Sequence, residues 1–334
     1  MLCASPLRER FELVEIHTHR DGSGWEKLTQ AAVGIGRLAV LLARRRVDLV
    51  HIHTASDASF RRKAIVAAAS RLARRPYVVH VHGGGFAEYA ASAGPVERAV
   101  IARTLRAAAR VVVLTDSWKG RLAHLAGDNI EVVPNPVASV PEGASAELGA
   151  PARIVCLGRL GDDKGSRVLV QALARLGEQR ADVRLCLAGD GDQGPIRLEA
   201  ERLGVIDRVE LPGWVDARRR DQLLAGSTIF ALPSRVEGLP MALLEAMAFG
   251  LPAVVSPVGG VPDVVGEGHG AIVVTPDDPA ALANAFETIM ADPARAIRMG
   301  AWNRAQVDTH YAVERVAERL AEVFDAALGA RRGR

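Results

Sequence analysis

Short runs of β-branched and apolar residues alternate with longer Ala-, Leu- and Arg-rich stretches along almost all of this 334-residue chain. Such alternation is typical of parallel β-sheets whose strands are joined by helices that cover both faces. Many of the short runs are apolar without a period of two, as expected of strands buried on both faces. The predicted strands lie at 11–19, 48–54, 77–82, 110–115, 130–135, 153–159, 183–189, 208–213, 228–234, 252–258 and 271–274.

The chain is too long for one typical domain and suits two. Segment 134–152 is rich in Pro, Gly, Ser and Ala, and it is the best candidate for a linker. From about residue 278 onward the chain is almost wholly helical. We therefore predict two doubly wound α/β domains, at 1–140 and 146–310. In such sheets ligands bind beyond the carboxyl ends of the strands.

The composition indicates an intracellular globular protein. No run of about 18 apolar residues occurs, so no transmembrane helix is expected. The first residues lack a basic segment followed by an apolar one, so no secretory signal is expected. Cys3, Cys156 and Cys186 are an odd number without paired spacing, which indicates free thiols in a reducing compartment. We therefore expect a cytoplasmic protein.

The N-terminal part of the chain is basic. Residues 1–140 hold 20 Lys and Arg against 12 Asp and Glu, whereas the remainder holds 22 against 27. Basic clusters at 43–46, 61–63 and 71–75 account for most of this excess. They are either solvated helix faces or a surface that attracts anionic lipid headgroups or an anionic acceptor. No nucleic-acid partner is expected, because aromatics are scarce and no zinc, RNP or helix-turn-helix signature occurs.

Two glycine-containing loops follow predicted strands of the C-terminal half. In "CLGRLGDDKG", residues 156–165, Arg159 ends the strand and Lys164 precedes a helix. Two cations and free backbone N–H groups at one point would suit a diphosphate, although the loop could also be a charged turn. "LAGDGDQGP", residues 187–195, is a second such loop, which is a weak signal by itself.

A third strand end carries two glutamates, in "PSRVEGLPMALLEAMAFGLP" at residues 233–252. Pro240 suits the first position of a helix. Glu237 precedes this helix and Glu245 lies about one turn inside it, which places the two carboxylates roughly 8–12 Å apart. That separation suits the sugar and the ribose of a nucleotide-sugar. It is too long for the carboxylate pair of a retaining glycosidase, which is about 5–5.5 Å apart.

Two histidine pairs end strands in the N-terminal half, in "HIH" at 51–53 and "HVH" at 80–82. Each pair lies on one face of its strand. A metal-dependent hydrolase would need a further ligand, for which Asp116 is the one candidate at a strand end. We favour the alternative, in which these histidines line a crevice and contact acceptor or donor, and we expect no metal.

Together "GRL…DKG", "AGDG", "LPSRVEGLPMALLEAMAFGLPAVVSPVGG" and "VVPNPV" resemble the family-4 retaining glycosyltransferases of the GT-B fold, over roughly residues 48–330. The resemblance implies two Rossmann-like domains facing across a crevice, with a C-terminal helix at about 311–330 completing the first. It implies metal-independent transfer of a sugar, with retention of configuration and no cofactor. The donor would be a nucleotide-sugar and the acceptor a glycan or a polyprenyl-linked glycan, at the inner face of a membrane.

The resemblance also implies roles for single residues. Glu237 would contact the donor sugar, and His82 would lie near the sugar and the acceptor. Arg159 and Lys164 would neutralise the diphosphate, and Glu245 would bind the ribose. The other donor-binding positions implied are Gly158, Gly189, Asp190, Val215, Gly238 and Leu239. These roles agree with the charge that develops during transfer, which is negative on the β-phosphate and positive at the anomeric carbon.

The family pattern begins with an apolar strand and a Gly-rich loop, and neither precedes residue 11 here. We expect this strand to be encoded upstream of Met1, or to be lost in a degenerate member of the family. Two functions therefore stay open, a sugar transferase and a catalytically inert protein that binds sugar nucleotides or a partner. A GT-B epimerase is a third alternative.

Overall fold

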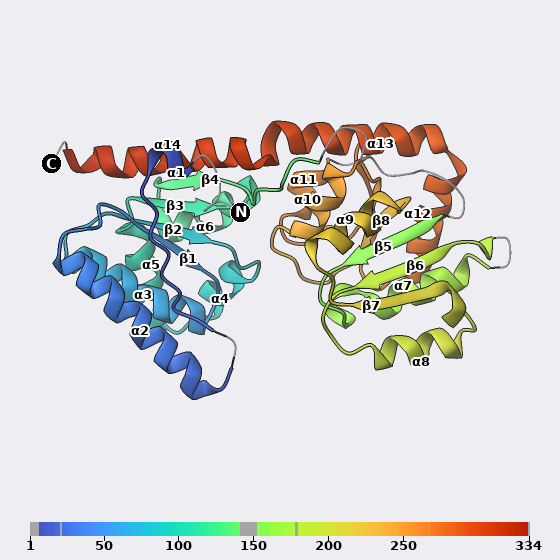
Figure 1. The fold of residues 1–334 in the computed structure, drawn as a ribbon, viewed down its shortest axis with the longest axis horizontal. Coiled ribbons are helices and arrows are strands. Elements are labelled where there is room, and N and C mark those ends of the chain that lie inside the picture. The colour runs from blue at the N-terminus through green and yellow to red at the C-terminus, as the bar shows by residue number, and fades with distance from the viewer. Residues whose placement is uncertain (1–6, 21, 141–151, 178–179, 267, 333–334) are drawn as a thin grey trace. The chain divides into compact units, whose positions relative to one another are not determined.

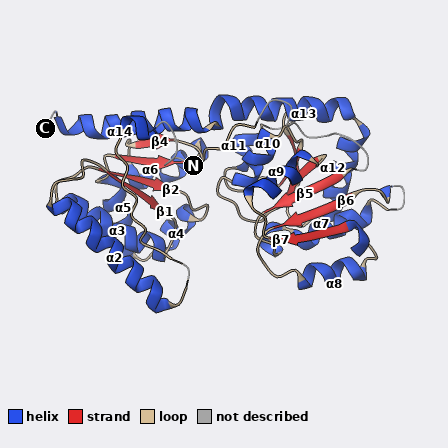
Figure 2. Ribbon diagram, viewed as in Figure 1, coloured by secondary structure: helices blue, strands red, loops and turns tan. Residues whose placement is uncertain are grey.

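The computed structural model describes residues 7–20, 22–140, 152–177, 180–266 and 268–332. The chain divides into two compact units. The N-terminal unit comprises Met1–Pro136 and Val313–Arg334, and the C-terminal unit comprises Val137–Ala312. Each contains a parallel β-sheet with helices packed against it (Figure 1, Figure 2).

The sheet of the N-terminal unit has four parallel strands in the order β1-β2-β3-β4. Their bounds are Val50–Thr54 (β1), Tyr77–Val81 (β2), Arg110–Val113 (β3) and Ile130–Val132 (β4). The register pairs His53 of β1 with His80 of β2. Because all four strands are parallel, their carboxyl ends meet at one edge, and side chains that follow them are brought together there.

Two helices of this unit begin at side-chain caps. Ser23 and Glu26 form a capping box at the start of α2, and the Thr115 side chain caps α6. The helices are α1 (Leu7–Arg10), α2 (Gly24–Ala43), α3 (Ala58–Leu72), α4 (Phe86–Ser92), α5 (Pro95–Arg106), α6 (Asp116–Ala126) and α14 (Val313–Arg332). The C-terminal helix α14 packs on this sheet, because its Leu320 and Phe324 share a core cluster with Val78 of β2.

The predicted strand at 11–19 is wrong, because this segment belongs to neither sheet. Its polar groups bond to helix side chains instead of to a neighbouring strand. Lys63 Nζ donates to Thr18 Oγ1 at 2.6 Å, and Gln30 Nε2 donates to the His17 carbonyl at 2.9 Å. The other ten predicted strands are confirmed, each trimmed by a few residues at its ends.

The sheet of the C-terminal unit has six parallel strands in the order β10-β9-β8-β5-β6-β7. Their bounds are Arg153–Leu157 (β5), Arg184–Ala188 (β6), Val209–Gly213 (β7), Ile229–Leu232 (β8), Ala253–Val255 (β9) and Ala271–Val273 (β10). The chain builds outward from β5 through β6 to β7, returns to β8 beside β5, and then continues to β10. This reversal makes the gap between β5 and β8 the topological switch point, where ligands bind in such sheets.

The described residues of this unit form seven α-helices. They are α7 (Ser166–Arg175), α8 (Gly194–Arg202), α9 (Ala217–Ala225), α10 (Met241–Ala248), α11 (Val261–Val265), α12 (Pro279–Ala291) and α13 (Pro293–Gln306). Aspartates cap three of them, namely Asp216 (α9), Asp278 (α12) and Asp292 (α13). Strand β8 is fully buried, and β5 is buried apart from Arg153, as their continuous apolar pattern predicts.

Two further expectations concern thiols and membrane spans. Cys156 and Cys186 are buried and free, and burial raises their pKa values to about 12 and about 11. Cys3 lies outside the described residues, as does most of the predicted linker at 134–152. Across the described ranges, every helix is too short or too polar to cross a bilayer.

Candidate functional site

The loops that follow β5 and β6 touch through their backbones. Gly158 and Gly189 both have a positive φ, of 138° and 153°. A Cβ atom on Gly189 would come within 1.8 Å of the Gly158 carbonyl oxygen, so only glycine fits. The Leu160 N–H also donates to the carbonyl of Asp190 at 2.5 Å. The predicted glycine loops therefore form one continuous backbone surface at the carboxyl edge of the sheet.

The loop after β5 is also packed against the loop after β8. It contains the 3₁₀ turn Asp162–Lys164, which ends at Gly165 in the left-handed conformation. A Cβ atom on Gly165 would lie 2.7 Å from the Pro233 carbonyl oxygen. This contact brings Lys164 to the switch point, where its Nζ lies 2.6 Å from Oε1 of Glu237.

Glu237 is held in place by its surroundings. Its side chain is only 8% exposed, and Oε1 accepts from both Lys164 Nζ and the Ser234 hydroxyl, the latter at 2.7 Å. Its backbone is fixed too, because a Cβ atom on Gly259 would lie 2.1 Å from the Glu237 carbonyl. Oε2 makes no hydrogen bond within the part of the chain described here. One carboxylate oxygen is thus anchored and the other is available.

Glu245 lies in α10 and forms an ion pair with Arg220 of α9, whose Nη1 is 2.6 Å from Oε1. Arg220 also contacts Asp221 at 2.8 Å. Burial raises the pKa of Glu245 above its usual range; Arg220 opposes this rise and Asp221 adds to it. The predicted place of Pro240 is wrong by one position: it is the N-cap, with ψ at 120°, and the helix begins at Met241.

The remaining predicted residues lie on the same edge of the C-terminal sheet. Arg159 is exposed directly after β5 and makes no hydrogen bond or ion pair with any described residue. Gly238 accepts a hydrogen bond from the Gly260 N–H at 2.7 Å, and Leu239 is buried beneath it. Val215 follows β7 and is half-buried. Their roles, and the predicted separation of the two glutamates, stay predictions.

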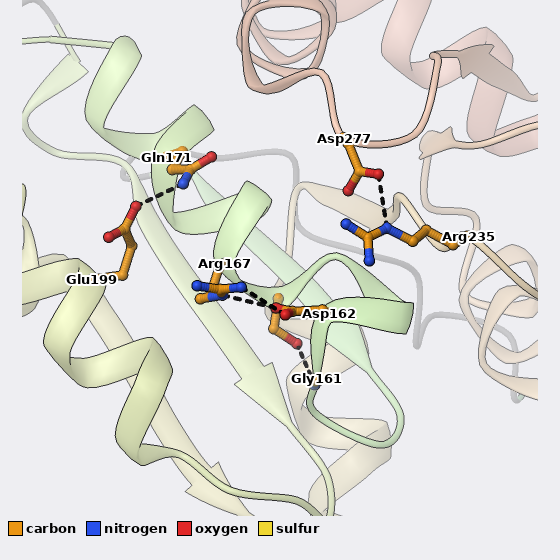
Figure 3. A network of polar contacts seen from close by, with 8 residues as sticks. Gly161, Asp162, Arg167, Gln171, Glu199, Arg235 and Asp277 are labelled. Carbon is orange, nitrogen blue, oxygen red and sulfur yellow. Dashed lines mark hydrogen bonds and ion pairs between the residues drawn. The ribbon is translucent and has the colours of Figure 1, made fainter.

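A polar network fixes the loop after β5 (Figure 3). Arg167 donates to both oxygens of Asp162, at 2.8 and 2.6 Å, and lowers the pKa of that carboxyl. The Ser166 hydroxyl accepts from the Gly161 N–H at 3.0 Å. Nearby, Arg235 from the loop after β8 donates to Asp277 at 2.7 Å. These contacts hold the turn that presents Lys164.

In the N-terminal unit, four histidines from β1 and the end of β2 stack on one face of the sheet. His51 Nε2 lies 3.2 Å from His80 Nδ1, and His53 Nδ1 lies 2.6 Å from His82 Nε2. Burial lowers the pKa of all four imidazoles, to about 4 for His53, although this ring keeps an exposed edge. The hydrogen bond between the His82 ring and the Asn135 side chain raises this pKa and partly offsets the lowering. The prediction that each pair shares a strand face is confirmed.

Sequence reasoning missed three residues that hold the predicted ones in place. Arg220 lies in a run of three arginines, where nothing distinguishes it from a solvated neighbour. Ser234 and Asn135 both lie at strand ends, inside the quoted motifs "LPSRVEG" and "VVPNPV". Their position could have identified them as site residues, because polar residues at the carboxyl ends of parallel strands line the edge of the sheet where ligands bind.

Comparison with known proteins gives the family. Residues 2–136 match the family described as Glycosyl transferase 4-like domain, and residues 151–292 match Glycosyl transferases group 1. The chain is 30% identical over 283 residues to a GDP-mannose-dependent alpha-(1-6)-phosphatidylinositol monomannoside mannosyltransferase of Mycolicibacterium smegmatis, covering 79% of this chain and 73% of the relative. It is 26% identical to the alpha-D-kanosaminyltransferase of Streptomyces kanamyceticus, covering 76% and 72%.

Solved structures show the same fold. The sucrose-phosphate synthase of Thermosynechococcus elongatus superposes with a TM-score of 0.73 at 23% identity, covering 92% of this chain and 79% of that one. Anabaena HepE in complex with UDP also gives 0.73, at 22% identity, covering 88% and 84%. The predicted GT-B fold is confirmed. The chain belongs to the family-4 glycosyltransferases of the GT-B fold.

Proposed function

We propose that this protein transfers a sugar from a nucleotide-sugar to a glycan or polyprenyl-linked acceptor, with retention of configuration and without a metal at the donor site. The observation that carries the proposal is the contact between Lys164 and Glu237, 2.6 Å apart at the switch point between β5 and β8. One relative is named for GDP-mannose, and HepE has been solved with UDP-glucose. The donor classes to test first are therefore GDP- and UDP-sugars.

The diphosphate would be neutralised by side chains of the loop after β5. Cleavage of the sugar–phosphate bond leaves negative charge on the β-phosphate, which preorganised cations stabilise. Arg159 is exposed and has no described partner, so its guanidinium is available for a bidentate contact. Lys164 adds a second positive charge. Two such cations supply the charge that Mg²⁺ supplies elsewhere.

The sugar would be held by Glu237. Positive charge develops at the anomeric carbon as the bond to phosphate breaks, and a fixed carboxylate nearby stabilises it. Ser234 and Lys164 both bond Oε1, which leaves Oε2 for the sugar. Because the carboxylate is already oriented and largely desolvated, little reorganisation is needed at the transition state.

The nucleoside would be held by Glu245. Ribose hydroxyls donate readily to a carboxylate, and Arg220 fixes the orientation of this one without covering it, since both side chains keep some exposure. We place the base and diphosphate along the backbone of Gly158, Gly189 and Asp190, where the glycines allow close approach. Val215, Gly238 and Leu239 complete this proposed surface.

The acceptor would be contacted by His82. Its lowered pKa keeps the imidazole neutral at pH 7, so that it can accept a proton or a hydrogen bond from an acceptor hydroxyl. Of the basic clusters, Arg61, Lys63 and Arg75 are engaged by Glu97, Thr18 and Asp48.

The remaining arginines leave a basic rim for anionic lipid, which would place the protein at the inner face of a membrane. We define this basic rim as Arg44, Arg45, Arg46, Arg71 and Arg74, which are all exposed. Arg71 lies in the last turn of α3, and the others follow α2 or α3; all of them precede β1 or β2, at the amino edge of the sheet. Lipid bound there leaves the carboxyl edge, with His82, open to an acceptor.

The test is a donor screen that measures nucleoside diphosphate release in the presence of EDTA. The wild type should consume one GDP- or UDP-sugar, and Lys164→Met and Glu237→Gln should each slow release at least about 100-fold, as expected for lost transition-state charge stabilisation. Binding without turnover for any donor and acceptor mixture would favour an inert binding protein. A changed sugar in recovered nucleotide-sugar would favour an epimerase.

A further inference from the structure

We propose that His51, His53 and His80 bind one divalent transition-metal ion, of the kind that prefers imidazole, such as Zn²⁺. The ligand nitrogens of these three side chains lie within 4.8 Å of one another. Sequence alone favoured no metal here, because it does not fix how two strands align. The register adds what was missing: His53 faces His80 directly, and His51 lies one pleat away on the same face.

The distances suit a tetrahedral ion after small side-chain movements. Zinc binds histidine nitrogen at about 2.0–2.1 Å, so two ligand nitrogens on one ion lie roughly 3.4 Å apart. His51 Nε2 and His80 Nδ1 are already 3.2 Å apart. The third ring, His53, is tilted against His51, with 4.2 Å between the ring centroids, and is stacked on His80 at 5.2 Å. Rotation about side-chain bonds, with the strands unmoved, can close this gap.

The two nitrogens of the His80 ring lie in different surroundings. His80 is 2% exposed, and its Nε2 has no hydrogen-bond partner in the described residues. The nitrogen that would bind the ion is the other one, Nδ1, which faces His51 Nε2 at 3.2 Å.

The chemistry of the ligands selects the ion. Three imidazoles without a carboxylate suit zinc, copper or nickel, and do not suit magnesium or calcium, which prefer oxygen. The exposed edge of His53 gives the ion a path from solvent. His82 Nε2 lies 2.6 Å from His53 Nδ1, outside the group of three ligands. A three-histidine site leaves the fourth coordination position to water or to another small ligand.

The test uses the whole chain without a histidine tag, stripped with a chelator and then dialysed against Zn²⁺ or Mg²⁺. We expect about one zinc and no magnesium per chain by elemental mass spectrometry. His51→Gln and His53→Gln should each weaken zinc binding at least about tenfold. His124→Gln, an exposed histidine of α6 in the same unit, is the matched control and should bind as the wild type does.

Cobalt substitution gives a second readout that does not depend on affinity. Co²⁺ in a tetrahedral nitrogen site should give intense visible absorption bands, and His53→Gln should change or abolish them while circular dichroism stays native. The proposal is overturned if the wild type retains no stoichiometric zinc. It is equally overturned if the two cluster variants bind zinc and cobalt as His124→Gln does, since the binding is then adventitious.

Discussion

Replacing Glu245 by Gln should weaken nucleoside diphosphate binding and leave the fold intact. The carboxylate is proposed to accept hydrogen bonds from the ribose hydroxyls, and its amide replacement keeps the shape but loses the charge. Arg220 would not be stranded by the change, because it also contacts Asp221 at 2.8 Å. The substitution should therefore remove a contact with the ligand without leaving Arg220 unpaired in the folded protein.

The expected size follows from the kind of bond removed. A hydrogen bond to a charged group is worth about 1.5–3 kcal/mol. Since about 1.4 kcal/mol is a factor of ten, Glu245→Gln should weaken GDP or UDP binding about 10- to 140-fold. Ribose contacts change little between the ground state and the transition state, so KM should rise more than kcat falls.

The effect on stability has the opposite sign. Burial raises the pKa of Glu245 in the folded state above its unfolded value near 4.5. The folded state thus holds this proton to a higher pH, and the carboxyl's favourable contribution is full below pH 4.5 and is lost as the pH rises through the folded pKa. At pH 7 the charged Glu245 lowers the free energy of unfolding. Gln should leave that free energy equal or higher, with a flatter dependence on pH above 4.5.

The assay is calorimetric titration with GDP and UDP, paired with chemical denaturation at pH 4.5 and 7. Glu287→Gln is the matched control, because Glu287 also pairs with an arginine in the C-terminal unit, Arg180, at 3.0 Å. This control should bind nucleotide normally. Unchanged affinity in Glu245→Gln, or an equal loss in both variants, would refute the ribose assignment; a large loss of stability in Glu245→Gln would refute the electrostatic reasoning.

Three further outcomes are expected. Glu237→Gln should lower kcat about 100-fold or more and change donor affinity little, measured by steady-state kinetics; equal losses in binding would contradict a role at the anomeric centre. Gly189→Ala should destabilise the C-terminal unit by about 2–5 kcal/mol, because its Cβ meets a carbonyl oxygen, and an unchanged melting temperature would count against this packing. The protein should co-sediment with anionic vesicles at low salt but not at about 1 M salt, where charges are screened within about 3 Å. The double variant Arg71→Glu with Arg74→Glu should not co-sediment at low salt. Co-sedimentation that does not depend on salt would exclude the basic rim as the binding surface.

Much of the fold could be predicted because buried parallel strands read as continuous apolar runs, as in "RIVCL" of β5. The segment 11–19 shows where this fails: its alternation resembles a strand, but pairing depends on a partner that local sequence does not identify. The site residues could be placed because they follow strands. The contact of Lys164 with Glu237 could not be predicted, because the two residues are 73 positions apart and meet only through the order of β5 and β8 in the sheet.

The histidine cluster and Arg220 show the same limit. Two His-x-His patterns predict shared faces, but only the pairing of His53 with His80 turns them into one group. Arg220 is one of three consecutive arginines, and only the placement of α9 near α10 brings this one to Glu245. Spacing along one element can be read from sequence, whereas alignment between elements cannot.

The most direct test of the proposal that the donor site needs no metal is calorimetric titration of GDP and UDP in EDTA, with and without added Mg²⁺, into the wild type and into Lys164→Met. We predict that at least one nucleoside diphosphate binds with the same affinity in EDTA and in Mg²⁺, and that binding falls about tenfold or more in Lys164→Met. Binding that requires Mg²⁺, or that is indifferent to Lys164, would contradict the placement of the diphosphate on the loop after β5.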